Sequence, residues 1–127
     1  MRIENMRTNI YLTEAEQKLA NLIWKKETIT SPELVVLAEK ELGWKKSTTY
    51  TILKKLCDKG VFKNENAKVT VLLTSTEQMT RQSRRYVEDA FGGSLPNFIT
   101  AFVGAGKLSP EKATELRQLI DALDGDD

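Results

Sequence analysis

The chain contains no histidine, and only one of its 127 residues, Cys57, is a cysteine. Histidine is the commonest general base and metal ligand, so its absence excludes a Ser-His-Asp or Cys-His nucleophile, and too few ligands remain for a zinc site. A single cysteine also excludes an internal disulfide and fits a reducing compartment. Carboxylate or lysine catalysis stays chemically open, but no motif points to it. We therefore expect neither an enzyme nor a cofactor or metal.

Long hydrophobic runs are also missing. No stretch approaches the roughly 20 apolar residues needed to cross a bilayer, and the N-terminal sequence MRIENMRTNIYLT lacks the apolar segment of a signal peptide. The expectation is a cytoplasmic protein without membrane insertion. A chain of 127 residues should form one compact unit, or one small domain with an appendage.

Charge is nearly balanced overall but unevenly distributed. The net charge of +1 divides into +4 over residues 1–75 and −3 over residues 76–127. Within residues 43–68, seven lysines stand against Asp58 and Glu65. Phosphate binding needs a local positive patch of this kind, whatever the total charge. The seven are Lys45, Lys46, Lys54, Lys55, Lys59, Lys63 and Lys68.

Two Thr-x-x-Glu capping boxes predict where the first helices begin. Residues 13–16 (TEAE) open a helix that should run to Lys25-Lys26, and residues 30–33 (TSPE) open a second helix with proline in its first turn. Gly43 should end the second helix. Thr28-Ile29, between the two, is expected to be a short extended break.

The stretch from Gly43 to Gly60 predicts a third helix with two different faces. Thr49, Ile52, Leu53 and Leu56 form an apolar stripe, and the remaining positions are largely cationic or hydroxylated. A β-prone segment at 61–63, a turn at 64–67 and a strand at 68–73 should follow as a hairpin. Three helices and a hairpin in this order predict a winged helix-turn-helix, with the third helix as the recognition helix.

The candidate DNA contacts lie on the third helix and the hairpin. Hydroxyls and lysines can reach base edges in the major groove, while other lysines neutralise phosphates. For the groove we select Ser47, Thr48, Tyr50, Thr51 and Lys54, although Thr48 could pack inward instead. For phosphates we select Lys45, Lys46, Lys55, Lys63 and Lys68. Thr30 and Ser31 could add a backbone contact or act only as helix caps. The simpler alternative is an ordinary amphipathic helix with solvated lysines.

Residues 76–127 predict three further helices, at about 77–91, from Ser94-Leu95-Pro96 to about 103, and from Ser109-Pro110-Glu111 to Leu123. Such a short segment has too little core to stand alone. We expect it to bury its apolar stripes against a second copy, or else to fold back on the winged helix. The residues expected at the dimer interface are Val87, Phe91, Leu95, Phe98, Ile99, Phe102, Leu116, Leu119 and Ile120.

Together these features predict a mainly α fold with a small β-hairpin. A winged-helix DNA-binding domain at 1–75 would precede a three-helix dimerisation domain at 76–127. Trp24 and Trp44 are expected to pack in the core or a turn, and Cys57 to be a buried small apolar residue. Arg81, Arg84 and Arg85 form a basic cluster that could reach flanking DNA or make ion pairs.

From about Ile10 to Leu123, the chain resembles the penicillinase-repressor family of bacterial transcription repressors. The stretches that carry the resemblance, by their order and spacing, are LTEAEQKLANLIWKK, ITSPEL, GWKKSTTYTILKKLCDKG and GGSLPNFITAFVGAGKLSPEKATELRQLID. The resemblance implies a homodimer that binds a palindromic operator in double-stranded DNA. It also implies repression of β-lactamase, metal-resistance or related genes, including antibiotic- or stress-resistance genes.

Several positions depart from the family pattern. In the antibiotic-responsive branch, a membrane sensor-peptidase pathway leads to cleavage of an Asn-Phe bond, and the matching bond here is Ala101-Phe102. The C-terminal Cys-x-Cys pair of the copper-responsive branch is absent, which disfavours metal sensing on that plan. Lys45 stands at the usual Ser/Thr N-cap, and Asn66-Ala67 replaces a glycine expected in the wing turn.

Two other functional classes compete with a repressor. A winged-helix protein-interaction module would not need DNA, but such modules usually carry acidic or apolar faces on the third helix. A ligand-responsive one-component regulator would need a convergent polar pocket, for which the sequence offers no pattern.

Overall fold

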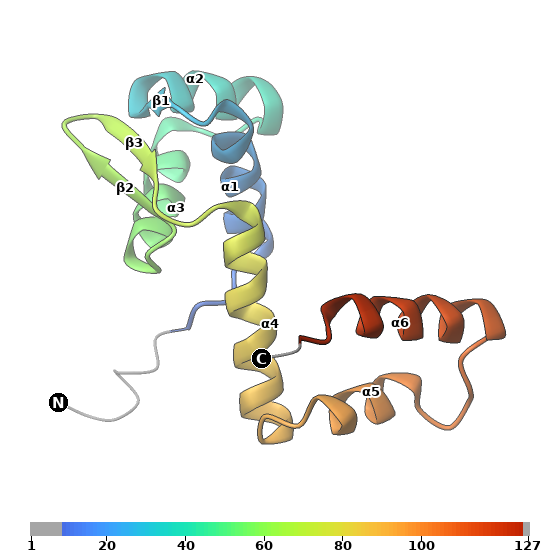
Figure 1. Ribbon diagram of the computed structural model, residues 1–127. Helices are drawn as coiled ribbons and strands as arrows, with labels where there is room; N and C mark the ends of the chain where they lie inside the picture. Colours follow the sequence, from blue (N-terminus) through green and yellow to red (C-terminus); the bar gives the residue numbers. More distant parts are fainter. Residues whose placement is uncertain (1–8, 126–127) are drawn as a thin grey trace, which may run out of the picture. The chain divides into compact units, whose positions relative to one another are not determined.

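The computed structural model describes residues 9–125 and is mainly helical, with one three-stranded antiparallel sheet (Figure 1). The elements in order are α1 (Glu14–Lys26), β1 (Ile29–Thr30), α2 (Ser31–Leu42), α3 (Lys46–Asp58), β2 (Phe62–Glu65), β3 (Lys68–Val71), α4 (Ser75–Phe91), α5 (Leu95–Val103) and α6 (Pro110–Leu123). In the described part of the chain, no helix is long and apolar enough to cross a membrane. Residues 1–8, considered above for a signal peptide, lie outside the described range.

The chain divides into two compact units, residues 1–85 and residues 86–127. The division falls inside α4, between Arg85 and Tyr86, so this helix contributes to both units. The expected boundary between DNA binding and dimerisation, after residue 75, concerns function and stays a prediction.

Side-chain caps fix the helix starts that the sequence predicted. Thr13 Oγ1 accepts a hydrogen bond from the Glu16 N–H at 3.2 Å, while Glu16 Oε1 accepts one from the Thr13 N–H at 2.9 Å. Thr30 and Glu33 repeat the same pair of bonds at 3.2 and 2.9 Å. The backbone N–H of Thr30, followed by its hydroxyl, lowers the pKa of Glu33. Both predicted capping boxes are confirmed.

A third capping box was overlooked in the sequence. Thr74 and Glu77 exchange the same two bonds, at 3.1 and 2.9 Å, and α4 therefore begins at Ser75 and not near residue 77. The signal was present as another Thr-x-x-Glu pattern.

The core of the first unit lies where α1, α2 and α3 meet the sheet. Its large fully buried apolar side chains are Leu19, Ile23, Leu34, Leu53, Leu56, Val61, Phe62 and Val69. Burying each large apolar side chain contributes about 1.5–3 kcal/mol. Trp24 packs against Phe62, with ring centroids 5.5 Å apart, and its Nε1–H donates to the Leu73 carbonyl at 2.9 Å. Trp24 therefore packs in the core, as expected.

The wing is the hairpin formed by β2, β3 and the turn between them, and its strands differ in length from those predicted. Asn64 and Glu65, expected in the turn, belong to β2 and pair with Val69 and Lys68 of β3. The turn is only Asn66-Ala67, with φ angles of 53° and 63°, as in a two-residue type I′ hairpin. β3 ends at Val71, short of residue 73.

β1 turns the predicted hairpin into a three-stranded sheet with strand order β1-β3-β2. Ile29 pairs with Val69, and the Ser31 N–H donates to the Ala67 carbonyl at 2.8 Å. The expected extended break at Thr28-Ile29 is thus an edge strand, shifted by one residue to Ile29–Thr30. A two-residue strand is too short to carry an alternating pattern.

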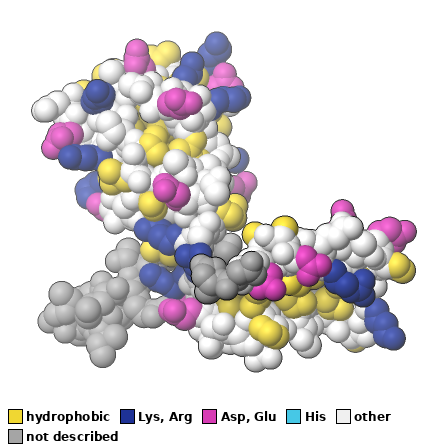
Figure 2. Space-filling model, in the orientation of Figure 1, with side chains coloured by type: hydrophobic (Ala, Val, Ile, Leu, Met, Phe, Trp, Pro, Cys, Tyr) yellow, Lys and Arg dark blue, Asp and Glu magenta, His cyan; other side chains and the backbone are white. Residues whose placement is uncertain are grey.

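The second unit contains the whole of α5 and α6 and the last part of α4. None of its described residues is fully buried. Tyr86, Phe91 and Phe98 form an edge-to-face cluster with centroid separations of 5.6–6.2 Å. Hydrophobic side chains gather on the surface of α5 and α6 (Figure 2). The unit therefore leaves much of its apolar surface uncovered.

Candidate nucleic-acid interface

α2 and α3 form a helix-turn-helix with a three-residue connection. Gly43 ends α2 in the left-handed conformation with φ 71°, and its N–H bonds to the carbonyls of Ala38 and Glu39. Trp44 then packs partly buried against the core, and its N–H reaches the Ala38 carbonyl at 3.3 Å. Only a residue that tolerates positive φ makes this turn without strain, so Gly43 determines where α2 ends.

α3 presents most of the predicted groove-facing residues to solvent. Thr49, Leu53 and Leu56 are buried along one side. Ser47, Thr51 and Lys54 recur at helical spacing on an exposed side, and Thr48 is exposed as well. Thr48 therefore does not pack inward; the threonine that does is Thr49, whose hydroxyl donates to the Lys45 carbonyl at 3.2 Å.

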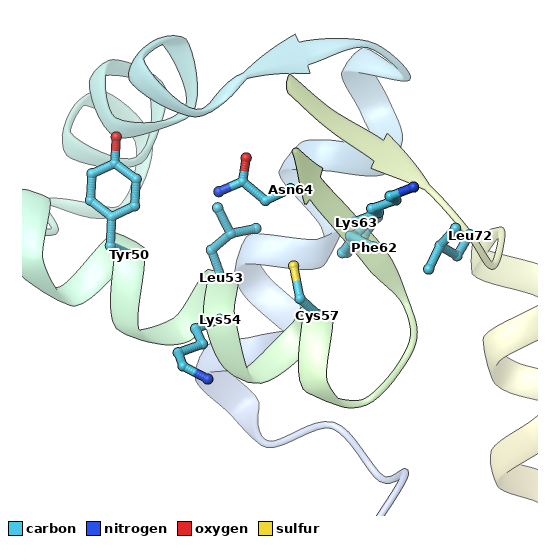
Figure 3. Close-up of a pocket in the computed structure, with 8 residues that line it drawn as sticks. All are labelled: Tyr50, Leu53, Lys54, Cys57, Phe62, Lys63, Asn64 and Leu72. Atoms are coloured by element: carbon cyan, nitrogen blue, oxygen red, sulfur yellow. The ribbon is translucent and has the colours of Figure 1, made fainter. Parts of the chain in front are cut away.

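A cleft of about 510 Å³ lies between α3 and the wing (Figure 3). Tyr50 and Lys54 line it from the helix, and Lys63 and Asn64 line it from β2. Leu53, Cys57, Phe62 and Leu72 add its apolar surface. The structure thus brings three predicted contact residues, Tyr50, Lys54 and Lys63, to one cleft. Sequence reasoning missed Asn64, which was assigned to the turn, and Leu72, which was assigned to the second strand of the hairpin.

Cys57 is a half-buried thiol in this cleft. Burial is the main cause that raises the pKa of Cys57, and the neighbouring Asp58 raises it further. The backbone N–H of Asn64 and the charge of Lys54 oppose this rise without cancelling it. A thiol that stays protonated at neutral pH is a poor nucleophile, in accord with the expected packing role.

Within residues 9–125, the N-terminus of α3 is unlike that of the other five helices. Thr13, Thr30, Thr74, Ser94 and Ser109 each accept a hydrogen bond that caps a helix. Lys45, at the N-cap of α3, makes no such bond, and the first turn contains no acidic residue. The exposed Lys45 and Lys46 instead place positive charge at the positive end of the helix dipole. An anion bound there would satisfy both the charges and the open N–H groups.

The lysines of the positive patch differ in their surroundings. Lys45, Lys46, Lys55 and Lys68 are exposed. Two further exposed lysines form ion pairs. Lys54 Nζ lies 3.3 Å from Asp58 Oδ2, and Lys63 Nζ lies 3.3 Å from Glu65 Oε1. Such exposed pairs contribute little stability and open readily when a phosphate competes.

Lys59 is the exception in this patch. Its side chain is only 13% exposed and is bonded to Glu16 and to the Tyr11 carbonyl. It therefore serves the fold, and the charge available to DNA is smaller than the lysine count suggested. Within the described residues, no group of three or more acidic or cysteine side chains is placed to hold a metal ion.

The predicted dimer residues lie on the second unit with differing exposure. Phe102 is 75% exposed, and Leu95, Leu119 and Ile120 are more than half exposed. Val87, Phe91, Phe98, Ile99 and Leu116 are half-buried. A largely apolar groove of about 330 Å³ lies between α5 and α6, lined by Phe98, Ile99, Phe102, Val103, Leu108, Lys112, Glu115, Leu116 and Leu119. Ala101 and Phe102 both lie inside α5 and are exposed.

Comparison with known proteins places this arrangement in a family. The model of the family described as Penicillinase repressor matches residues 12–122. The penicillinase repressor of Bacillus licheniformis is 23% identical over 114 residues, covering 87% of this chain and 89% of that protein. The methicillin resistance regulatory protein MecI of Staphylococcus aureus (strain N315) is 20% identical over 113 residues, covering 86% and 92%.

The match extends over both units of the chain, from Leu12, two residues before α1, to the last turn of α6. Proteins of this family are transcriptional repressors without enzymatic activity, and they bind DNA operators as dimers. The chain belongs to the penicillinase repressor family.

Proposed function

We propose that this chain represses transcription by binding a palindromic operator as a homodimer. The observation that supports this most directly is the N-terminus of α3, where two exposed lysines stand in place of the side-chain cap that each of the other described helices has. This arrangement costs the free protein stability, and a DNA phosphate would turn it into a favourable contact. A helix needed only for packing would gain from a Ser or Thr at that position.

The residues divide into two sets of proposed contacts. Ser47, Thr48, Tyr50, Thr51 and Lys54 would face base edges in the major groove, where hydroxyls and lysines can discriminate bases. Lys45, Lys46, Lys55, Lys63 and Lys68 would contact phosphates and position the protein. Thr30 serves as a helix cap and Ser31 is buried, so we assign neither to DNA.

Dimerisation would use the uncovered face of the second unit. Leu95, Phe102, Leu119 and Ile120 are exposed there, and a second copy would remove this apolar surface from water. Two half-sites bound together raise both affinity and specificity. The cationic face of α3 argues against a protein-interaction module, which would not need a positive patch.

The regulated genes are proposed by likeness to the relatives. One relative is named a penicillinase repressor and another a methicillin resistance regulatory protein, so we propose antibiotic- or stress-resistance genes as targets. Induction by a sensor-peptidase pathway would have to cut Ala101-Phe102 inside α5. A helical bond must unfold locally before a protease can cut it.

The proposal is tested by selecting binding sites for the full-length protein from a random duplex library. We expect a palindromic sequence, bound at least about 1,000-fold more tightly than random duplex at physiological salt. Affinity should fall steeply as salt rises, because bound lysines release counterions from the phosphates. Equal affinity for the selected and random duplexes would contradict the proposal.

A further inference from the structure

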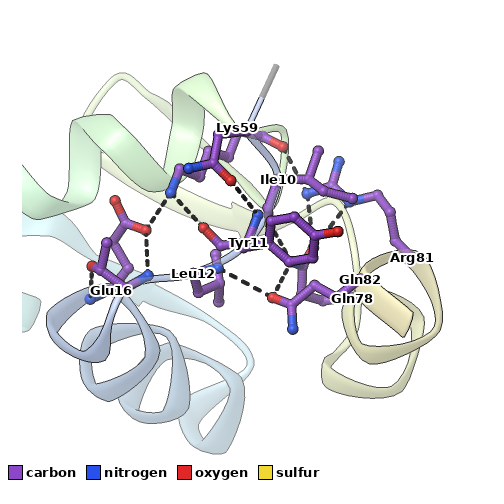
Figure 4. A network of polar contacts seen from close by, with 10 residues as sticks. Ile10, Tyr11, Leu12, Glu16, Lys59, Gln78, Arg81 and Gln82 are labelled. Carbon is purple, nitrogen blue, oxygen red and sulfur yellow. Dashed lines mark hydrogen bonds and ion pairs between the residues drawn. The ribbon is translucent and has the colours of Figure 1, made fainter. Parts of the chain in front are cut away.

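Arg81, on α4, bonds to the chain at the point where α3 ends and the wing begins (Figure 4). Its Nη2 donates to the main-chain carbonyl of Lys59, the C-cap residue of α3, at 2.8 Å. A Cβ atom at Gly60 would lie only 3.8 Å from Arg81 Nη1. Both terminal nitrogens of the guanidinium therefore lie at the Lys59-Gly60 junction. Arg81, α3 and the wing all belong to the first unit.

Gln78, the fully buried residue of α4 among those described, holds the Arg81 side chain in this position. Only 2% of the surface of Gln78 is exposed, and its Oε1 accepts from Arg81 Nε and Nη2 at 3.1 and 2.7 Å. Its Nε2 donates to the Ile10 carbonyl at 2.8 Å and to Gln82 Oε1 at 2.7 Å. All hydrogen-bonding groups of this amide are used, so the direction of the guanidinium is fixed as well.

The wing is joined to the rest of the first unit at its base, and Arg81 ties the two sides of that base together. The chain enters the wing through Val61 and leaves it into α4, and the N–H groups of Leu72 and Leu73 donate to the Val61 carbonyl at 2.9 and 3.1 Å. Beyond the buried Phe62, the other residues of β2 are exposed. Strands rise about 3.3 Å per residue, so a small tilt at the base moves the exposed end of β2 by enough to break a hydrogen bond.

We propose that Arg81 is a positioning residue that holds the wing where Lys63 reaches a DNA phosphate while α3 occupies the major groove. The inference rests on the proposed function, in which α3 and the wing contact one duplex. Arg81 uses its donors on Gln78 and Lys59, so it acts through the wing and not as a DNA contact of its own. Lys46, at the opposite end of α3, does not depend on the base of the wing.

The test is a double-mutant cycle on the full-length protein, with binding to a random-sequence duplex measured at about 0.1 M salt. In the wild-type background, Lys63→Ala should weaken binding by about 5- to 10-fold, because one phosphate contact is lost. In the Arg81→Ala background, the same change should cost about 2-fold or less, because the wing no longer holds Lys63 at the phosphate. Lys46→Ala should cost about 5- to 10-fold in both backgrounds, since its proposed contact comes from α3.

Controls separate this role from a purely structural one. Arg84→Ala removes the same charge from an exposed position on α4 and should leave the Lys63 effect at full size. If thermal melting shows Arg81→Ala to be unfolded at the assay temperature, Arg81→Lys takes its place. This variant keeps the charge but loses the forked geometry, and it should at least halve the logarithm of the Lys63 effect.

Three results would overturn the inference. The first is a Lys63 effect that keeps its full size in a folded Arg81 variant. The second is an equal shrinkage of the Lys46 effect, which would mean that Arg81 supports the whole DNA-binding surface. The third is a wild type that Lys63→Ala does not weaken, since the wing would then have no contact to position. A wild type that binds its selected sequence no better than random duplex would instead overturn the proposed function, and the cycle on random duplex would still decide the role of Arg81.

Discussion

Lys59 Nζ lies 2.5 Å from Glu16 Oε1, in an ion pair that solvent barely reaches. The pair joins the C-cap residue of α3 to the first turn of α1, two elements far apart in the sequence. Burial alone would raise the pKa of Glu16, but hydrogen bonds from Lys59 and Thr13, together with the charge of Lys59, hold it below the ordinary value of 4.5. Glu16 is therefore charged in the folded state and stabilises it.

This lowered pKa predicts how stability depends on pH. The contribution of Glu16 is complete above its unfolded pKa, near 4.5, and is lost as pH falls through the lower folded pKa. At pH 7, Glu16→Gln should lower the free energy of unfolding by about 1–3 kcal/mol, and the difference from wild type should shrink below pH about 4. Urea titrations at several pH values measure this. Glu14→Gln, at a position 87% exposed on the same helix, should change little.

A second prediction concerns the uncapped N-terminus of α3. Lys45→Ser should raise the free energy of unfolding by about 1 kcal/mol, because serine can cap the helix. The same change should weaken binding to all duplexes and reduce the salt dependence by about one phosphate contact. Thermal melts and salt titrations test both effects. Lys107→Ser removes the same charge from an exposed loop outside α3, and it should change neither the free energy of unfolding nor the affinity for DNA. A variant that loses stability would contradict the expected capping, and one that keeps full DNA affinity would contradict the phosphate role.

Sequence alone predicted those parts of the fold whose signals are local. Thr13-Glu16 and Thr30-Glu33 cap their helices through contacts three residues apart, and Gly43 ends α2 through its own backbone angle. The position of β1 required β3, which lies nearly 40 residues later in the chain. The partner of Lys59 lies 43 residues away. No local pattern distinguishes this lysine from Lys55, which is exposed.

The candidate site was likewise predictable where its signals are local, but not where it depends on contacts between residues far apart in the sequence. Helical spacing correctly placed Ser47, Thr51 and Lys54 on an exposed side of α3. Periodicity could not show that Asn64 lines the cleft, because that depends on where the wing turns. Nor could it show that Gln78, a polar residue, is the buried anchor of α4.

The wing turn gives a third prediction. Ala67 adopts φ 63°, a left-handed conformation that costs residues other than glycine and asparagine about 1 kcal/mol. Ala67→Gly should therefore raise the free energy of unfolding by a few tenths to about 1 kcal/mol. The gain is smaller than the full strain, because glycine loses more conformational entropy on folding than alanine does. Its carbonyl would still accept the bond from the Ser31 N–H. Thermal melting should show a higher midpoint with unchanged operator affinity, and a lower midpoint would rule out relieved strain.

A fourth prediction separates base contacts from phosphate contacts. Thr51→Ala and Lys54→Ala should each reduce the preference for the selected operator over random duplex by about 1–3 kcal/mol. Lys63→Ala, on the wing, should weaken binding to both duplexes by a similar factor and leave the preference intact. Competition binding at fixed salt measures the ratio. If Lys63→Ala changed the preference more than Thr51→Ala did, the two assignments would have to be exchanged.

The last prediction concerns the uncovered face of the second unit. Phe102, 75% exposed on α5, lines the apolar groove between α5 and α6. Phe102→Asp would place a charge in a surface that a second copy should bury, and unpaired buried charges are strongly unfavourable. We expect the dimer dissociation constant to rise by about 100-fold or more, as measured by sedimentation equilibrium. Val36→Asp offers a matched control, because Val36 is 65% exposed on α2, in the first unit, and should leave the dimer intact. A Phe102→Asp protein that sediments as wild type would place the dimer interface elsewhere.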